Sequence, residues 1–313
     1  MFRYVLGRML AAIPVLAFVA VFIFSLIHLA PGDPAVLIAG DAATPEQVAA
    51  IREKMNLDAP LWQQFAQWTF GLFQGDLGTS VFSNQPVSKL ILGRIEPTLM
   101  LAVYTLVLSV ALAVPLGVLA AHKARTWIDS TAMLASVAGF SVPVFVVGYA
   151  LMYVFAIQLR WFPVQGYKSL SDGLLECLHS LTLPAVALST VFAALIARVT
   201  RAAMLEVLSE DYVRTARAKG LSTLRVLVVH ALKNAGVPIA TVVGIAFAIL
   251  VGGVVVTESV FNLPGLGRLT VDAVLRRDYP VVQGVILTFS LLLVLINIMV
   301  DLSYSLFDPR IRI

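Results

Sequence analysis

The stretch MLAAIPVLAFVAVFIFSLIHLA, residues 9–30, contains no Asp, Glu, Lys or Arg. A helix that crosses the hydrocarbon core of a bilayer needs about 20 mostly apolar residues, and this stretch has that length. Arg3 and Arg8 precede it, as basic residues also precede the apolar core of a secretory signal peptide. Because such a core is only about 7–15 residues long, we expect a first membrane-spanning helix that is retained.

The composition of the whole chain favours a membrane protein. Of its 313 residues, 59% are hydrophobic and 13% are charged, with a mean hydropathy of +0.92. Soluble globular domains carry about 25% charged residues, so this chain has too few to cover a soluble core. The net charge of +4 is typical of membrane proteins with basic cytoplasmic loops. Since no nucleic-acid-binding motif is present, we expect membrane lipid as a partner and no nucleic acid.

Five further apolar stretches are long enough to span a membrane. They cover residues 97–121, 128–159, 181–199, 237–257 and 281–306. The second of them is longer than one straight span requires and contains Pro143, so we expect a tilt or a kink there. The sequence therefore predicts an all-α integral membrane protein with about six transmembrane helices.

The predicted spans divide the chain into three parts. These are residues 1–30 with the first helix, an outer region at 31–96, and a core at 97–313 with the other five helices. In the outer region, the spacing of Phe65, Trp68 and Leu72 favours an amphipathic helix that lies against the membrane or belongs to a small domain.

The distribution of basic residues predicts the orientation of the chain in the membrane. If the N-terminus is inside, most of the 22 Lys and Arg residues fall in the inside segments, although the outside segments are longer. Because basic residues accumulate on the cytoplasmic side, we expect both termini in the cytoplasm.

The segment 200–235 holds the densest cluster of basic residues and contains an unusual loop. Its sequence begins with Ser209-Glu-Asp, continues through helix formers and reaches Gly220, a residue typical of helix C-termini. Ser222 follows and is suited to cap a second helix at 224–232. The sequence thus predicts a compact helix–turn–helix projection, with a solvated basic hairpin as the alternative.

This loop resembles the cytoplasmic signature loop of binding-protein-dependent ABC importer permeases. Its Asp-Tyr-x-Arg-Thr-Ala-Arg-Ala-Lys-Gly sequence, followed by His-Ala-Leu-Lys-Asn, is similar to the peptide and nickel branch. Arg214 stands where other branches carry a Glu, so the role of that Glu does not transfer. The resemblance implies an ATPase-coupling role for Glu210, Asp211, Tyr212, Arg214, Thr215, Ala216, Arg217, Ala218, Lys219, Gly220, His230 and Asn234.

Further motifs extend the resemblance over nearly the whole chain. They are His28-Leu-Ala-Pro-Gly-Asp-Pro, Gly75-Asp-Leu-Gly-Thr-Ser, Glu258-Ser-Val-Phe-Asn-Leu-Pro-Gly-Leu-Gly, Arg277-Asp-Tyr-Pro-Val-Val-Gln and Asp308-Pro-Arg-Ile-Arg. The resemblance implies the type I permease fold in a bacterial inner membrane, with a small periplasmic domain between the first two helices. The implied partners are a second homologous permease in a heterodimer, two cytoplasmic ABC ATPases and an extracytoplasmic solute-binding protein.

The function implied by the resemblance is ATP-driven alternating access for short peptides, either di- or oligopeptides or glutathione-like solutes, with nickel as the alternative. The sequence contains no Gly-x-x-x-x-Gly-Lys-(Ser/Thr) motif, so ATP and Mg would be used by the partner ATPases and this chain is not an enzyme. With a single cysteine, Cys177, and no pair of histidines at helical spacing, we expect no metal site and no bound cofactor.

A second group of residues is a candidate pore or gate. It comprises Ser141, Pro143, Glu258, Asn262, Pro264, Gly265, Gly267 and Asp301. For Asp301 we expect an ion pair with a basic residue such as Arg198 or Arg201, or a position at the membrane interface, since charges within a bilayer are costly unless paired. For Glu258 we expect a helix cap or a hydrogen bond between subunits.

Three rival functions were weighed against the importer. An ion-coupled secondary transporter would need ionisable groups near the middle of the membrane and inverted repeats, neither of which is evident. An intramembrane enzyme would need His-Glu-x-x-His, Gly-x-Ser-x-Gly or paired Asp residues within its helices, and none is present. A structural scaffold would leave the detailed loop unexplained.

Overall fold

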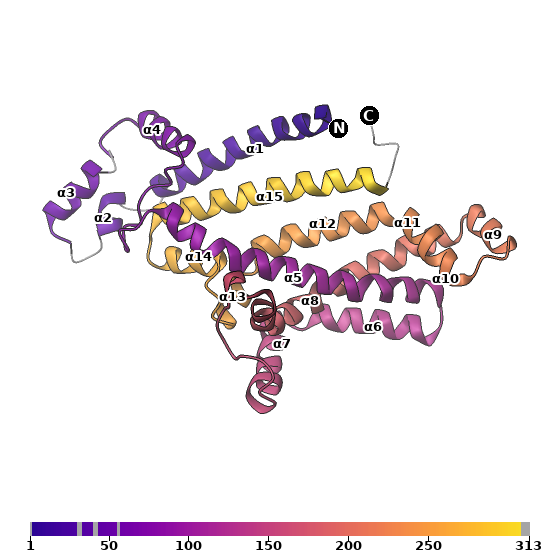
Figure 1. Cartoon of the computed structure of the whole chain (residues 1–313). Coiled ribbons are helices and arrows are strands. Elements are labelled where there is room, and N and C mark those ends of the chain that lie inside the picture. Colours follow the sequence, from indigo (N-terminus) through magenta and orange to yellow (C-terminus); the bar gives the residue numbers. More distant parts are fainter. Residues whose placement is uncertain (1, 30–32, 40–42, 55–56, 308–313) are drawn as a thin grey trace.

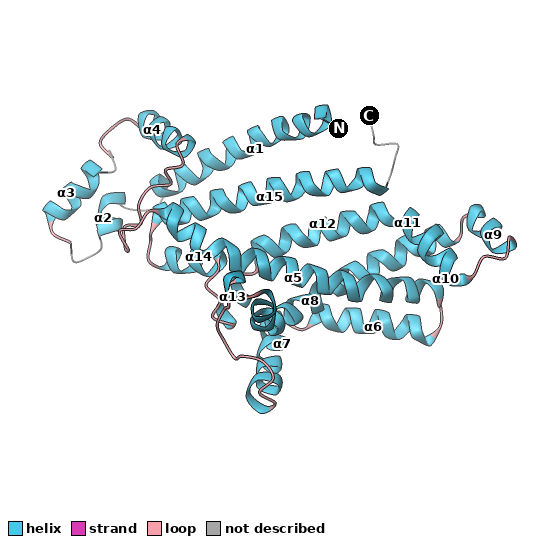
Figure 2. Cartoon of the chain, in the orientation of Figure 1, coloured by secondary structure: helices cyan, strands magenta, loops and turns pink. Residues whose placement is uncertain are grey.

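The computed structural model describes all residues except 1, 30–32, 40–42, 55–56 and 308–313. Within the described residues the secondary structure is helical, and no β-strand is formed (Figure 2). The helices are α1 (Phe2–Leu29), α2 (Pro34–Ala39), α3 (Pro45–Lys54), α4 (Leu61–Phe73), α5 (Val87–His122), α6 (Trp127–Ser141), α7 (Val144–Leu151), the π-helix η1 (Met152–Gln158), the 3₁₀-helix η2 (Leu170–Asp172), α8 (Leu174–Leu208), α9 (Asp211–Ala218), α10 (Thr223–Arg225), the π-helix η3 (Val226–Ala231), α11 (Leu232–Asn234), α12 (Gly236–Gly253), α13 (Val255–Val260), α14 (Leu266–Leu275) and α15 (Tyr279–Phe307).

The number of membrane spans agrees with the sequence. Five described helices, α1, α5, α8, α12 and α15, are long and apolar enough to cross a membrane. The bent pair of α6 with α7 and η1 would make a sixth span, which confirms the expected all-α membrane fold with about six helices.

The expected kink near Pro143 is a bend of 96° between α6 and the α7–η1 segment. Proline disfavours the helical conformation in the residue before it, and Val142 accordingly adopts an extended conformation with φ −86° and ψ 125°. Because proline also has no backbone N–H to donate, α6 ends at Ser141 and α7 starts in a new direction.

Helices α5 and α8 form the central pair of the bundle. The buried face of α8 is rich in small side chains, among them Ala185, Ser189, Ala194 and Ala197. Small residues let helix backbones approach closely inside a membrane, where association depends on packing. Helices α6 and α12 pack against α8. Helix α12 also contacts α15, and α1 packs on α15 at the edge of the bundle.

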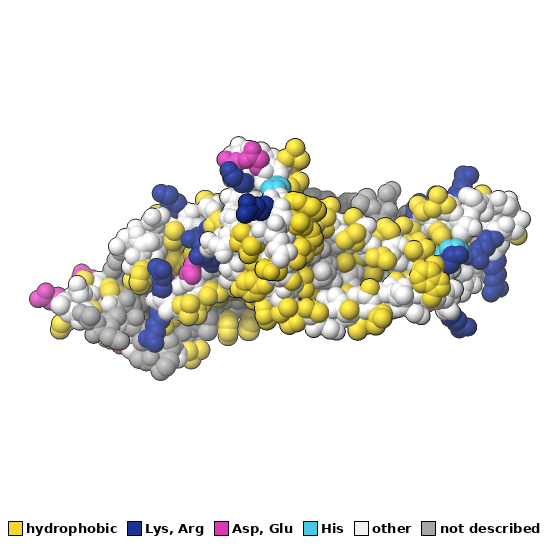
Figure 3. Space-filling model, turned by 90° about the horizontal axis from the view of Figure 1, so that it is seen from below, with side chains coloured by type: hydrophobic (Ala, Val, Ile, Leu, Met, Phe, Trp, Pro, Cys, Tyr) yellow, Lys and Arg dark blue, Asp and Glu magenta, His cyan; other side chains and the backbone are white. Residues whose placement is uncertain are grey.

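The long helices run side by side and give the molecule two distinct ends (Figure 1). One end carries α2, α3 and α4 together with α13 and α14, and the opposite end carries the α9–α10 loop, the start of α1 and the end of α15. In the space-filling view, Lys and Arg lie toward both ends of the molecule, with Asp and Glu visible among them only away from the α9–α10 end (Figure 3). The surface between the two ends shows hydrophobic and uncharged groups. A surface of this kind fits a lipid environment.

The region between α1 and α5 is helical and packs on α1. In α4, the rings of Phe65 and Trp68 lie 5.2 and 5.8 Å from the ring of Phe24 on α1. The amphipathic helix expected around these two aromatic residues is therefore present and rests on the first spanning helix. Helix α5 begins at Val87, so its first turns lie within the stretch that the sequence placed in the outer region.

Candidate functional site

The loop between α8 and α12 is a small folded unit. Val213 and Ala216 on one face of α9 are buried against Val226, with Leu208 and Leu221 packed around them. Positions three apart lie on the same face of a helix, so α9 buries this face and leaves its polar residues outside. The alternative expectation of a solvated hairpin does not fit this apolar core.

The turn after α9 has the geometry that requires glycine. Gly220 has φ +78°, and side chains with a Cβ rarely adopt this conformation. The Gly220 N–H donates to the Arg217 carbonyl (2.9 Å) and the Leu221 N–H donates to the Ala216 carbonyl (3.3 Å). These two bonds form a Schellman motif, which satisfies the last carbonyls of the helix. The expected helix stop at Gly220 is confirmed.

The start of the loop differs in detail from the expectation. Glu210 is the residue before the first turn of α9, and its side chain makes no capping hydrogen bond. Ser209 instead donates through Oγ to the Glu206 carbonyl at the end of α8. Ser222 precedes α10 as expected, without a side-chain cap. The second helix at 224–232 is divided among α10, η3 and the start of α11.

The loop is braced against the membrane helices through η3. Leu227 and Ala231 of η3 are buried in one cluster with Ala121 of α5, Met204 of α8 and Ile239 of α12. Helix α9 packs on η3, so the loop is joined through η3 to three spanning helices.

His230 and Asn234 connect the η3–α11 segment to α9. The Asn234 side-chain amide donates to the His230 carbonyl (2.7 Å), and the Asn234 side chain also hydrogen-bonds Tyr212. Burial, and secondarily the neighbouring Glu210 charge, raise the pKa of Tyr212 above its ordinary value. The structure thus brings together residues that are far apart in the sequence of this loop.

The charged residues of α9 face away from its apolar core. Asp211 and Arg214 form an ion pair at 3.2 Å, and Thr215 donates to the Asp211 carbonyl. Arg217, Ala218 and Lys219 are exposed at the end of the helix. Among the described residues, no salt bridge involves Arg217 or Lys219. Both basic groups are therefore presented to the surroundings.

The outer candidate residues converge on the start of α14. Glu258 on α13 is fully buried, and its carboxylate accepts hydrogen bonds from the Arg268 backbone N–H (2.9 Å) and from the Gly267 backbone N–H. The carboxylate therefore caps the N-terminus of α14, where the helix dipole favours a negative charge. The helix cap expected for Glu258 is confirmed, within one chain. Burial raises the pKa of Glu258, and its hydrogen bonds oppose this rise.

The loop before α14 is shaped around this carboxylate. A Cβ atom built on Gly265 would lie 2.1 Å from a Glu258 carboxylate oxygen, so only glycine fits there. Asn262 has φ +53° and accepts a hydrogen bond from the Arg268 guanidinium. Pro264 lies between Asn262 and Gly265 in the same loop.

Ser141 and Pro143 lie at the 96° bend, apart from the α14 cap. The Ser141 hydroxyl donates to the Val137 carbonyl within α6, and Pro143 precedes the first turn of α7. Helix α7 packs against α13, so the element that follows the bend contacts the element that carries Glu258.

The ion pair expected for Asp301 is present, but with a basic residue other than the two named from the sequence. Asp301 pairs with Arg8, with 2.9 Å between the Arg8 Nε atom and the carboxylate, and not with Arg198 or Arg201. This contact joins α15 to α1 at the edge of the bundle. Hydropathy located Asp301 within the last helix but did not reveal that this face of α15 turns toward α1.

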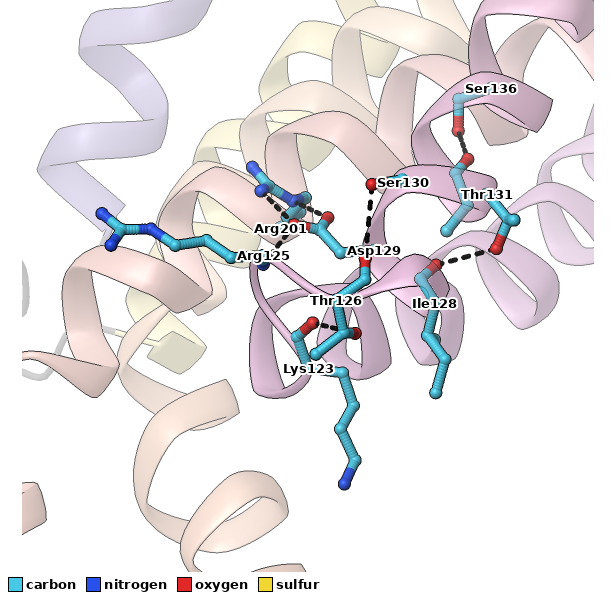
Figure 4. Close-up of polar contacts among 10 residues, drawn as sticks. Lys123, Arg125, Thr126, Ile128, Asp129, Ser130, Thr131, Ser136 and Arg201 are labelled. Atoms are coloured by element: carbon cyan, nitrogen blue, oxygen red, sulfur yellow. Dashed lines mark hydrogen bonds and ion pairs between the residues drawn. The ribbon is translucent and has the colours of Figure 1, made fainter.

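The most enclosed ion pair of the described residues joins Asp129 to Arg201 (Figure 4) and was not predicted from the sequence. Asp129 falls within the apolar stretch 128–159, and Arg201 was named only as one of two example partners for Asp301. The spacing of Thr126 and Asp129 is that of a capping box and signals a helix start, but it does not identify Arg201 as the partner of Asp129.

Family comparisons agree with this arrangement. Residues 113–313 match the family model described as "Binding-protein-dependent transport system inner membrane component". The chain belongs to this family. Residues 1–102 match the model of the corresponding N-terminal part, "Binding-prot-dependent transport system membrane comp, N-term". The protein is thus a multi-pass inner-membrane permease subunit and has no catalytic role of its own.

Relatives of this permease match it along nearly its whole length. A probable peptide ABC transporter permease protein from Sinorhizobium fredii is 54% identical over 309 residues, covering 99% of both chains. A putative peptide transport system permease protein from Brucella abortus is 46% identical, covering 98% of both. A glutathione transport system permease protein from Salmonella typhi is 44% identical, covering 100% of this chain and 99% of the relative.

The permease is also similar to a solved structure, a chain of the MetNI methionine ABC transporter in an inward-facing conformation. The TM-score is 0.59 at 17% identity, over 70% of this chain and 96% of that one. This similarity shows a shared type I importer permease fold. As a component of an ABC transport system, the permease works with ATPase and solute-binding partners, and the family requires no cofactor on this subunit.

Proposed function

We propose that this permease imports short peptides, either di- or oligopeptides or glutathione-like solutes, by ATP-driven alternating access. The names of the relatives support this substrate class, since peptide and glutathione permeases are 44–54% identical to this chain over nearly its full length. A second, homologous permease would complete the pathway as the other half of a heterodimer.

The observation that carries the proposal is the folded α9 loop. Its buried face, its Schellman turn and its attachment to α5, α8 and α12 make it a stiff element that projects from the bundle. Arg217 and Lys219 are exposed at its tip, where they suit an acidic groove on one of the two partner ATPases, and the second permease would dock on the other. Charges of this kind guide association and set its register more than they add affinity.

The proposed orientation places the α9 loop and both termini in the cytoplasm. The start of α1 and the end of α15 lie at the same end of the bundle as the loop (Figure 1), and the charged side chains visible at that end are Lys and Arg. The opposite end, with α2 to α4 and the α14 cap, would then face the extracytoplasmic solute-binding protein.

We assign the outer gate to the group of α7, α13 and α14. Ser141 and Pro143 set the direction of α7, and Glu258, Asn262, Pro264, Gly265 and Gly267 hold the loop that precedes α14. Asp301 lies in the α1–α15 contact and is left out of this gate.

The first experiment is purification of the tagged permease from its native membrane in mild detergent, followed by mass spectrometry. A homologous permease and ABC ATPases should copurify, and charge reversal at Arg217 and Lys219 should remove the ATPases. The matched control is Lys89→Glu, an exposed basic residue at the opposite end of the bundle, which should keep them. Recovery of the same ATPases with the Arg217 and Lys219 variant would contradict the assigned docking tip.

The second experiment is uptake into proteoliposomes that hold the purified complex and its binding protein. Peptide uptake should require ATP, and nickel offered in the same assay should not be taken up. Uptake that continues without ATP would overturn the importer in favour of a secondary transporter.

A further inference from the structure

The carboxylate of Asp129 holds the cytoplasmic end of α8. It accepts two hydrogen bonds from Arg201, from Nε at 2.5 Å and from the terminal NH2 group at 2.7 Å. It also accepts the Arg125 backbone N–H at 3.0 Å (Figure 4). Asp129 is 5% exposed. Bidentate pairs of a guanidinium with a carboxylate combine strength with a fixed geometry.

The position of this pair in the chain connects two moving parts. Arg201 lies two turns before the end of α8, which leads through Ser209 and Glu210 directly into α9. Asp129 lies in the first turn of α6, and α6 ends at the 96° bend that directs α7 toward α13. The pair therefore joins the helix that carries the α9 loop to the helix that leads to the outer elements.

A second contact holds α6 near its other end. The Arg198 guanidinium lies over the Phe140 ring, 5.5 Å from its centroid. Both arginines belong to α8, so one helix holds α6 near its first and last turns. An apolar seam alone would allow α6 and α8 to slide, whereas a buried charge pair resists separation because an unpaired buried charge is costly.

We infer that Asp129 and Arg201 are positioning residues that transmit the displacement of α9 through α8 to α6, and so to the bend at Pro143. This inference rests on the proposed importer function. Neither residue touches ATP, substrate or a partner in this role. Their removal should separate ATP hydrolysis from transport, because the ATPases would still dock on α9 while α6 would no longer follow α8.

The test uses the reconstituted complex with Asp129→Asn and, separately, Arg201→Lys. ATPase copurification should equal that of the unaltered complex, while solute transported per ATP hydrolysed should fall by about tenfold, as expected when a coupling network loses one member. Arg201→Lys keeps the charge without the planar two-point geometry, so its loss should be smaller. Glu176→Gln, which removes an exposed ion pair with Lys168 at the other end of α8, should keep the normal ratio.

A normal transport-to-ATP ratio in both Asp129→Asn and Arg201→Lys would overturn the inference. If the unaltered complex shows no ATP-dependent transport, the proposed importer function fails instead, and the two failures are thereby distinguished.

A second measurement tests the Asp129–Arg201 ion pair in the full-length permease without its partners. Spin labels at the exposed positions Thr131 on α6 and Thr215 on α9 would report the distance between the two elements, in a Cys177→Ser background. The distance distribution should be narrow in the otherwise unaltered chain and clearly broader with Asp129→Asn. Equal widths would show that the pair does not hold the elements together and would overturn the inference.

Discussion

The hydroxyl of Thr98 on α5 donates a 2.6 Å hydrogen bond to the Glu258 carboxylate on α13 and accepts one of 2.8 Å from the Leu266 backbone N–H. Both side chains are fully buried. One hydroxyl and one carboxylate thus join the outer parts of α5, α13 and α14, and the N-terminus of α14 is satisfied without any solvent.

Removal of this carboxylate should destabilise the permease. Glu258→Ala removes the acceptor of the Thr98 hydroxyl proton and leaves the Arg268 backbone N–H at the start of α14 without its acceptor. The cost is about 1–3 kcal/mol for each unsatisfied buried group. The single cysteine, Cys177, is fully buried, so a thiol-reactive dye can report unfolding in detergent. A lower midpoint temperature is expected, with Glu258→Gln less affected because the amide oxygen still accepts. An unchanged midpoint for Glu258→Ala would contradict the capping role.

The turn at Gly220 should determine coupling without determining membrane insertion. Gly220→Val forces a β-branched residue to a φ of +78°, which it tolerates poorly, so uptake should be lost while the amount of protein in the membrane is unchanged. Gly220→Asn is the matched control, since asparagine adopts this conformation more readily, and it should retain uptake. Normal uptake with the valine variant would show that the turn geometry is not needed.

The proposed orientation can be tested with single cysteines in a Cys177→Ser background. Gln165 in the connection before α8 and Thr215 on α9 are both exposed, and they belong to loops on opposite sides of α8. In intact spheroplasts, a membrane-impermeant thiol reagent should label a cysteine at 165 and should label one at 215 only after permeabilisation. The reverse pattern would place the α9 loop outside and would contradict the importer.

The pairing of Arg8 with Asp301 predicts a specific energetic coupling. The Arg8 and Asp301 side chains are 50% and 15% exposed, so the pair should contribute no more than about 1 kcal/mol. In a double-mutant cycle followed by the dye reaction of Cys177, Arg8→Gln and Asp301→Asn should be non-additive. Arg201→Gln and Asp301→Asn should be additive, because these residues do not pair. Additivity in the first cycle would contradict the observed contact.

The helical class, the spans, the bend at Pro143 and the helix stop at Gly220 could all be predicted from the sequence. Each depends on local properties: a span on the apolar length of one segment, the bend on the geometry before proline, and the stop on a single φ angle. The coupling residues were placed on one loop by their resemblance to a known motif. Their division into a buried face with Ala216 and an exposed tip with Arg217 became visible only in the folded loop.

The sequence by itself determined that this chain is a membrane protein of about six helices with a folded basic loop, because length, hydropathy and turn chemistry act over short distances along the chain. The tertiary structure decided which polar and charged groups meet. Arg8 reaches Asp301, Arg201 reaches Asp129 and Thr98 reaches Glu258, in each case across more than 70 positions. These partners depend on which helix faces pack together. A hydropathy pattern does not determine that packing, because many different residues fit the same pattern. Only the packed structure brings a given pair within hydrogen-bonding distance.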